Sequence, residues 1–353
     1  MEMMTHTPIT VFGSGAIGGT IGAHMRRAGH DVQFVDQALD HVQAINQQGL
    51  KISGFENFTV AAIALTPDKL LGPLGLVFLA VKSQDTDTAL TVIKPLCGPD
   101  TVVISLQNGM NPPRIAQQLG SKHVVAGFVS FPADWQSPGH IEQGGVGNIW
   151  LGELDGRITE RLTRIKSLLD HAVTGHITDN IFGYLWSKQI DCSILFAQAV
   201  TNGTFAEIFA HPDYQRLLIA LLGEGVGIAR AAGIELRQFG EFNPNKMRPT
   251  NPQEELEARE VLNRFAAVCA KQIKVRSGQW RDLAVRKRPT EVDHMLGWLI
   301  EQGQKFNLPV TLNQHLAAQV KGIEQGTRTH SLKNLDELEQ LRQQLYGPGI
   351  GPV

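Results

Sequence analysis

The sequence predicts an α/β fold with a mainly parallel sheet, followed by an all-α domain. From residue 10 to about residue 176, β-branched apolar runs alternate with helical segments, which is typical of a sheet covered by helices on both faces. Strand patterns then disappear, and apolar residues recur at helical spacing. A chain of 353 residues is also long enough to build two hydrophobic cores.

The first predicted elements are a strand and a helix joined by a glycine-rich turn. Residues 9–12 form a mainly apolar run rich in β-branched residues, residues 13–18 read Gly-Ser-Gly-Ala-Ile-Gly, and residues 20–28 have helical character. A second apolar run at 32–36 ends in Asp36, near the offset at which a dinucleotide-binding fold places an acid against a ribose. The alternative interpretation is a glycine-rich loop in some other βαβ unit.

Each glycine of this turn has a physical task. Gly13 allows a sharp turn, Gly15 lets backbone amides approach a pyrophosphate, and Gly18 lets the helix pack close to the strand. The N-terminus of the helix offers unpaired N–H groups and the positive end of its dipole to the anion. We therefore expect the cofactor to contact Gly13, Ser14, Gly15, Ala16, Ile17, Gly18 and Asp36.

The rest of the first domain follows the same alternation. Further strands are expected at 76–81, 102–106 and 124–129. Residues 141–143 and 148–152, separated by glycines, are expected to pair as a hairpin that extends or caps the sheet. A helix over 159–171 and a short strand near 176–178 complete this domain.

The second domain is expected to be helical. Apolar residues at helical spacing predict helices at 181–197, 214–232, 252–274 and 291–306. We accordingly predict a dinucleotide-binding domain at 1–179, a helical substrate and dimerisation domain at 180–346, and a loose tail rich in Gly and Pro at 347–353.

Composition excludes several classes of function. The net charge of -2 gives no reason to expect a nucleic-acid or membrane partner. Three distant cysteines argue against a disulfide framework, and the first eight residues lack the apolar core of a signal peptide, so a cytoplasmic location is expected. The histidines are scattered, without His-Glu-x-x-His or Cys-x-x-Cys pairs, so no metal site is expected.

Candidate functional residues follow the predicted strands and lie on the helical domain. Ligands of open α/β sheets bind beyond the carboxyl ends of the strands, where Lys82 and Asn108 are expected to contact the cofactor, with Asn108 also near the substrate. Lys188 lies among apolar helical residues and needs an anionic partner or a depressed pKa, which makes it a candidate proton donor. The alternatives are turn residues at 82 and 108, a snorkelling lysine at 188, and an acid at Glu291 that only matches a helix dipole.

The ordered set of motifs resembles the ketopantoate reductase (2-dehydropantoate 2-reductase) family over nearly the whole chain. The matching segments are Gly13 to Gly18, Val81-Lys82, Gln107 to Met110, Pro138-Gly139, Leu185 to Lys188, and Pro289 to Asp293. The resemblance implies an N-terminal Rossmann domain and a C-terminal domain like that of 6-phosphogluconate dehydrogenase, with substrate in the cleft between them. It also implies reduction of 2-dehydropantoate to pantoate, in pantothenate and CoA biosynthesis, with Lys188 as general acid and Glu291 beside the substrate.

Three positions depart from the family pattern. Cys192 and Phe196 stand where members of the family usually have asparagines that hold the substrate, and the serine segment before the Thr-Glu motif is replaced by a stretch that ends in Asp282. All three are expected to contact the substrate. The exchange of two amides for apolar groups leaves open the same hydride chemistry on another 2-oxo or 2-hydroxy acid.

Cofactor preference and catalysis are the remaining open choices. The resemblance suggests NADP, whereas a carboxylate at Asp36 repels a 2′-phosphate and favours NAD. A nicotinamide-binding sensor without turnover is the alternative from a different class, although a sensor has no need for both Lys188 and Glu291. No pattern specifies the oligomeric state, and a homodimer is left open.

Overall fold

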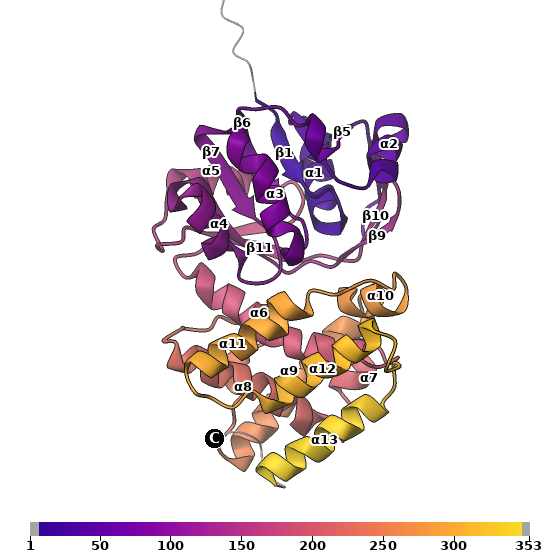
Figure 1. The fold of residues 1–353 in the computed structure, drawn as a ribbon, viewed down its shortest axis with the longest axis vertical. Helices are drawn as coiled ribbons and strands as arrows, with labels where there is room; N and C mark the ends of the chain where they lie inside the picture. The colour runs from indigo at the N-terminus through magenta and orange to yellow at the C-terminus, as the bar shows by residue number, and fades with distance from the viewer. Residues whose placement is uncertain (1–6, 348–353) are drawn as a thin grey trace, which may run out of the picture. The chain divides into compact units, whose positions relative to one another are not determined.

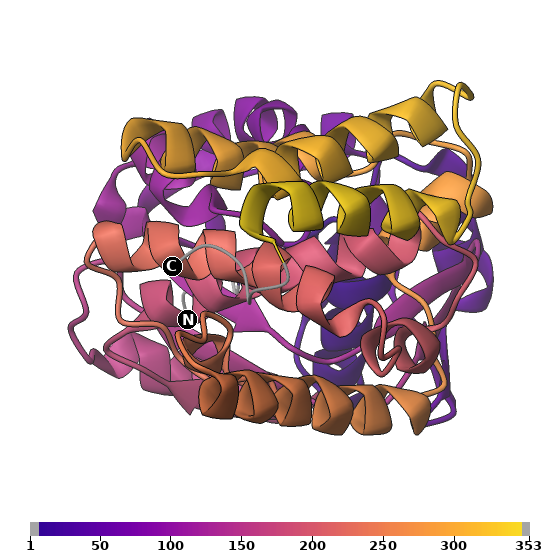
Figure 2. The ribbon, with the colours of Figure 1, turned by 90° about the horizontal axis from the view of Figure 1, so that it is seen from below.

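The structure is a computed structural model that describes residues 7–347 (Figures 1 and 2). The chain divides into two compact units, residues 1–181 and residues 182–353. The loose tail expected at 347–353 lies, from residue 348 onward, outside the described residues. Among the described residues, no helix is long and apolar enough to cross a membrane.

Unit 1 is built on an eight-stranded sheet with the order β12-β11-β8-β7-β6-β1-β2-β5. Neighbouring strands are parallel except at the pair of β8 and β11, so the predicted mainly parallel α/β fold is confirmed. The strands are β1 (Ile9–Phe12), β2 (Val32–Val35), β5 (Ile63–Leu65), β6 (Leu74–Leu79), β7 (Cys97–Ser105), β8 (Val124–Val129), β11 (Asn148–Gly152) and β12 (Thr174–Ile177).

Helices cover this sheet on both faces because its strands are apolar on both sides. One core contains buried residues of α1 (Ala16–Arg27) and α5 (Glu160–Leu169), and the other contains buried residues of α3 (Thr86–Ile93) and α4 (Asn111–Leu119) (Figure 1). The first helix begins at residue 16, four residues before the predicted start, so the glycine turn leads directly into it. The remaining helical segments of unit 1 are α2 (Leu39–Gln48), η1 (Pro67–Lys69), η2 (Ser83–Asp85), η3 (Lys94–Leu96) and η4 (Ser121–His123).

The predicted hairpin of residues 141–143 and 148–152 is wrong. β10 (His140–Gln143) belongs to a second sheet of order β4-β3-β10-β9, whereas β11 lies in the main sheet. The two-residue turn Pro138-Gly139, with Gly139 at φ +71°, joins β9 to β10 instead. The other strands of this sheet are β3 (Leu50–Gly54), β4 (Phe58–Val60) and β9 (Ala133–Ser137), none of which was predicted.

Unit 2 is helical, as predicted (Figure 2). Its long helices α6 and α8 are buried along most of their length, so they form the centre of this unit. The elements are α6 (Ile181–Ala199), α7 (Phe205–Phe209), α8 (Gln215–Ala231), η5 (Pro244–Lys246), α9 (Pro252–Ala270), α10 (Gly278–Ala284), the π-helical turn η6 (Asp293–Gly297), α11 (Trp298–Lys305), α12 (Thr311–Glu324) and α13 (Lys333–Tyr346).

A buried carboxylate on α8 caps the N-terminus of α12. Glu224 accepts hydrogen bonds from the backbone N–H groups of Leu312 (2.9 Å) and Asn313 (3.1 Å) and from the Asn313 side chain (2.8 Å). Asn313 in turn accepts a hydrogen bond from Ser193 of α6 (2.7 Å), so the three helices share one polar network. Burial raises the pKa of Glu224 to about 7, although these hydrogen bonds act in the opposite direction.

The raised pKa of Glu224 predicts a pH-dependent stability. Between pH 4.5 and about 7 the folded state holds a proton at Glu224 that the unfolded chain has already released, so stability falls as pH rises through this window. The expected loss of unfolding free energy is about 3 kcal/mol. Urea unfolding of the wild type and of Glu224→Gln at several pH values measures it, and an identical pH slope in both proteins would contradict the assignment.

Candidate active site

The predicted cofactor residues of unit 1 lie at one edge of the main sheet. They follow β1, β2, β6 and β7, which are neighbours in the order β7-β6-β1-β2 and run parallel. The carboxyl ends of these strands therefore meet at the same edge, where open α/β sheets bind their ligands. This edge carries the turn at 13–18 together with Asp36, Lys82 and Asn108.

The glycine turn has room for a ligand at one position and none at two others. Gly13 has φ +93°, and a Cβ there would lie 2.6 Å from the backbone nitrogen of Val81. A Cβ at Gly18 would collide with the Gly13 carbonyl oxygen, whereas one at Gly15 would meet nothing within 4 Å. No side chain caps the N-terminus of α1, and its first turn contains no acid. These features fit a bound anion at the helix terminus.

Asp36 is tied to the turn by two hydrogen bonds. Its Oδ2 accepts from the Ser14 backbone N–H at 2.9 Å and from the Ser14 hydroxyl at 3.3 Å, while Oδ1 accepts from the Ala38 N–H at 3.0 Å. The carboxylate is half-buried and thus held in one orientation at the end of β2. Oδ1, which accepts only one of these hydrogen bonds, keeps a lone pair that can accept from a ribose hydroxyl.

His41 of α2 also holds the glycine turn in place. Its Nδ1 faces two donors, the Gly139 N–H at 2.9 Å and the Trp135 Nε1–H at 3.3 Å. The hydrogen therefore lies on Nε2, which donates to the Ser14 carbonyl oxygen at 2.9 Å. This buried imidazole links the turn to the β9–β10 hairpin of the second sheet.

A polar network joins the loops that carry Lys82 and Asn108. The Ser83 hydroxyl donates to the Asn108 carbonyl oxygen at 2.5 Å, and the Asn111 amide donates to Ser83 and to the same carbonyl. Gln107 bridges back to the Val81 carbonyl oxygen at 3.0 Å. The side chain of Asn108 is exposed and that of Lys82 is half-buried, so both reach the surface at the strand edge.

In unit 2, Lys188 lies one helical turn from a buried acid. The Lys188 Nζ is 3.4 Å from the Asp191 Oδ2, and 23% of the lysine side chain is exposed against 1% of the aspartate. The ammonium also lies 5.7 Å from the centre of the Phe239 ring, within the range of a cation–π contact. Burial raises the pKa of Asp191, and the nearby Lys188 offsets only part of this effect.

The segment that carries Glu291 is fastened beside α6. Gln189 donates to the backbone carbonyl oxygens of Met295 (2.8 Å) and His294 (3.1 Å) in η6. On the other side, the Thr290 N–H and hydroxyl both donate to Glu324 of α12 at 2.7 Å. Glu291 is itself buried and lies close enough to Cys192 to help raise the pKa of that thiol, an effect due mainly to burial.

The three remaining predicted residues are all inaccessible. Cys192 and Phe196 are fully buried on α6, and the Cys192 thiol donates to the Lys188 carbonyl oxygen at 3.0 Å. Asp282 is 1% exposed, and its Oδ1 accepts from Arg286 (3.2 Å) and Arg288 (3.0 Å). Structure thus brings Lys188, Cys192 and Glu291 into one neighbourhood, while Asp282 holds a basic loop.

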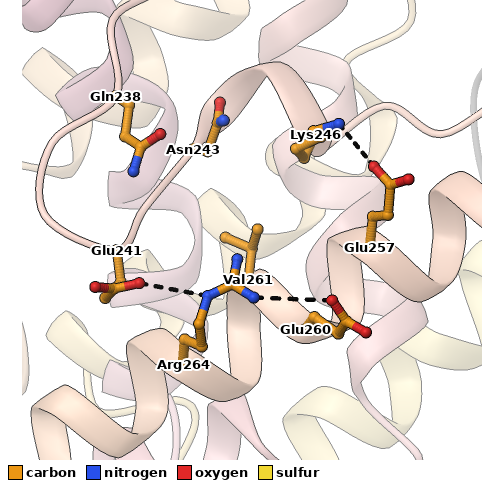
Figure 3. A pocket seen from close by; sticks show the side chains of 8 residues that line it. All are labelled: Gln238, Glu241, Asn243, Lys246, Glu257, Glu260, Val261 and Arg264. Atoms are coloured by element: carbon orange, nitrogen blue, oxygen red, sulfur yellow. Dashed lines mark hydrogen bonds and ion pairs between the residues drawn. The ribbon is translucent and has the colours of Figure 1, made fainter.

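A polar pocket elsewhere in unit 2 contains none of the predicted residues (Figure 3). It lies between α9 and the loop around η5, and its charges pair with one another: Lys246 with Glu257 at 2.6 Å, and Arg264 with Glu241 at 3.3 Å. Its lining is Gln238, Glu241, Asn243, Lys246, Glu257, Glu260, Val261 and Arg264.

Several residues that organise these sites were not singled out from the sequence. Ser83 and Asn111 lie in the stretches after predicted strands, so their position was a usable signal. The spacing of Asp191, three residues after a lysine in an apolar helix, was a second usable signal. Nothing in the sequence marks His41, because its contacts with Ser14, Trp135 and Gly139 join segments far apart in the chain, and the β9 strand of Trp135 was not predicted.

Comparison with known proteins places both units in one family. Residues 9–156 match the family described as ketopantoate reductase PanE/ApbA, and residues 180–324 match its C-terminal domain. The 2-dehydropantoate 2-reductase of Pyrococcus horikoshii is 29% identical over 90% of this chain and 97% of its own, and that of Archaeoglobus fulgidus is 26% identical over 90% and 98%. A crystal structure of a PanE/ApbA family ketopantoate reductase from Ralstonia eutropha JMP134 has a TM-score of 0.76 at 26% identity, covering 91% of this chain and 99% of that one.

The open space at Gly15 predicts a variant that folds but binds dinucleotide poorly. Gly15 is extended with a negative φ of -70°, and a Cβ there meets nothing within 4 Å, so Gly15→Ala should change thermal unfolding little. Its methyl group would occupy the space in front of the helix terminus and should raise the Kd for NADH about tenfold or more, equivalent to about 1.4 kcal/mol.

Gly13→Ala is the matched control, because its methyl group meets backbone atoms. It should lower stability by about 1–3 kcal/mol. Fluorescence titration and thermal melts measure both effects. Equal loss of stability in the two variants would show that Gly15 is structural.

Proposed function

Because the chain belongs to the ketopantoate reductase family, we propose that it reduces a 2-oxo acid to a 2-hydroxy acid with NAD(P)H, with 2-dehydropantoate as the first candidate substrate. The chain is an oxidoreductase of the 2-dehydropantoate 2-reductase type. The observation that carries the proposal is the partly exposed ammonium of Lys188, held on a buried helix next to the buried Asp191, with Glu291 acting on the neighbouring Cys192.

The strand edge of unit 1 suits a nicotinamide dinucleotide. We assign the pyrophosphate to the turn from Gly13 to Gly18 and the adenosine ribose to Asp36, because of the open helix terminus and the oriented carboxylate. Lys82 and Asn108, on the two loops that share one polar network, are assigned to the nicotinamide half. When bound, the reduced nicotinamide supplies a hydride to a carbonyl carbon.

Asp36 also argues for NADH over NADPH. A phosphate on the ribose 2′-oxygen would lie against a carboxylate that two N–H groups hold in place, so it could not easily turn away. Repulsion between like charges at short range disfavours that complex, whereas a ribose hydroxyl can donate to the remaining lone pair of Oδ1.

Lys188 is the proposed proton donor. As the carbonyl carbon accepts hydride, its oxygen gains negative charge, and an ammonium within hydrogen-bond distance stabilises that charge. One N–H bond of Lys188 breaks and an O–H bond of the 2-hydroxy acid forms, which leaves a neutral amine that regains a proton from water. We assign Glu291 to a hydrogen bond that orients the substrate or the Lys188 ammonium for proton transfer.

A second candidate is another 2-oxo acid, favoured by the side chains beneath Lys188. Cys192 and Phe196 stand in place of the asparagines typical of the family, and both are fully buried. We propose that they act on specificity through packing, because neither offers a polar group to a substrate hydroxyl. Arg286, oriented by Asp282, is better suited than Asp282 itself to meet an anionic substrate.

Nicotinamide absorbance at 340 nm tests the reaction and the cofactor preference together. The purified chain should oxidise NADH when given 2-dehydropantoate or another member of a panel of 2-oxo acids, and not without a 2-oxo acid. At equal concentrations we expect kcat/KM to be about tenfold or more higher with NADH than with NADPH. A preference for NADPH would overturn the role of Asp36, and inactivity towards the whole panel would overturn the proposed reaction.

Removal of the Lys188 amine tests the proton donor. Lys188→Ala should lower kcat by roughly 10²–10⁴-fold, the usual contribution of general acid catalysis, with an unchanged Kd for NADH. Lys246→Ala is the matched control, because this lysine is also ion-paired but lines the pocket of Figure 3. It should retain full activity. Near-normal turnover in Lys188→Ala would remove that residue from the mechanism.

A further inference from the structure

We propose that Asp191 is a positioning residue that holds the Lys188 ammonium in its reactive orientation. The inference rests on the role proposed above for Lys188 as proton donor. Asp191 itself does not contact the reacting atoms in this scheme. It acts by fixing the charge and the rotamer of the lysine, which otherwise has four flexible bonds.

The geometry gives Asp191 one partner. Its Oδ2 lies 3.4 Å from the Lys188 Nζ, one helical turn away on α6. Its Oδ1 is buried and has no hydrogen-bond partner among the described residues. An ammonium has three N–H donors, so a single long contact to Asp191 leaves two of them for a substrate oxygen.

The cost of this arrangement argues for a functional role. A buried carboxylate with one unsatisfied oxygen destabilises a fold, and replacing such a group by an apolar one of similar size is often neutral or stabilising. A purely structural ion pair in the same unit looks different: Arg342 donates two hydrogen bonds of 2.8 Å to the two oxygens of Glu339. Asp191 has a hydrogen bond to only one of its two oxygens, so its contribution to stability is expected to be small or negative.

The surroundings identify the groups that could share its titration. Lys188 and Cys192 lie on α6 itself, Cys269 interacts electrostatically with Asp191 from α9, and Glu291 acts on Cys192 from the segment before η6. Both thiols are buried, and burial raises their pKa, that of Cys269 to about 12, so neither carries a charge at neutral pH. Lys188 is then the cation that balances Asp191.

Two substitutions test the proposal in the full chain with NADH and 2-dehydropantoate, or the panel member reduced fastest. Asp191→Asn keeps the size of the side chain, and Asp191→Val removes its polarity. Both should lower kcat about 10- to 100-fold through misplacement of the ammonium, with an unchanged KM for NADH. Asp191→Val should also keep or raise the thermal midpoint. A structural residue would lose stability and activity together.

Glu339→Gln provides the matched control, because it breaks an i,i+3 ion pair on α13. It should lower the thermal midpoint and leave kcat unchanged. A double-mutant cycle completes the test: in the Lys188→Ala background, Asp191→Asn should have no further effect on kcat. An equal loss in both backgrounds, or a kcat within about twofold of the wild type in both Asp191 variants, would overturn the inference. Near-normal activity of Lys188→Ala alone would instead overturn the proposed function.

Discussion

The turn between β1 and α1 is the constraint on which the first unit depends. A side chain at Gly13 would collide with the backbone at Val81, and one at Gly18 would collide with the Gly13 carbonyl oxygen. Only because both positions are glycine can α1 start directly after β1 and pack against the loop that follows β6. This close packing brings the helix terminus to the same edge as Asp36 and the loops after β6 and β7.

Sequence patterns predicted this part of the fold well, because buried parallel strands have a strong local signature. β1 and β8 have the predicted bounds, and the other predicted strands of the parallel core differ by a few residues. The prediction of strand pairing failed, because which strands lie side by side depends on contacts between distant parts of the chain. β10 and β11 are both readable as strands, but alternation says nothing about which strand lies beside which, and they belong to different sheets. The strands β4 and β5 have three residues each, which is too few to show a period.

The helical unit shows a different limit of sequence reasoning. The spacing of apolar residues predicted α6, but the helix is buried on nearly every side. The partners of its buried polar residues therefore cannot be predicted from periodicity. Gln189 binds the carbonyl oxygens of η6, and Ser193 connects to Asn313. These contacts hold the segment of Glu291 next to the helix of Lys188, although the two residues are about a hundred positions apart in the chain.

Burial also changes the meaning of the departures from the family pattern. An amide at position 192 or 196 would need hydrogen-bond partners in a core, and burying it without them is unfavourable. Cysteine and phenylalanine at these positions need few hydrogen-bond partners or none, so the helix next to Lys188 is packed at both positions without access to solvent. In an environment that excludes water the attraction between Lys188 and Asp191 is stronger than at a solvated surface, and the side chains at 192 and 196 carry no amide that could compete for the ammonium. The loss of two amides and the presence of an acid at 191 are therefore one physical change: the lysine takes its orientation from a charge within its own helix rather than from neutral hydrogen-bonding groups around the substrate.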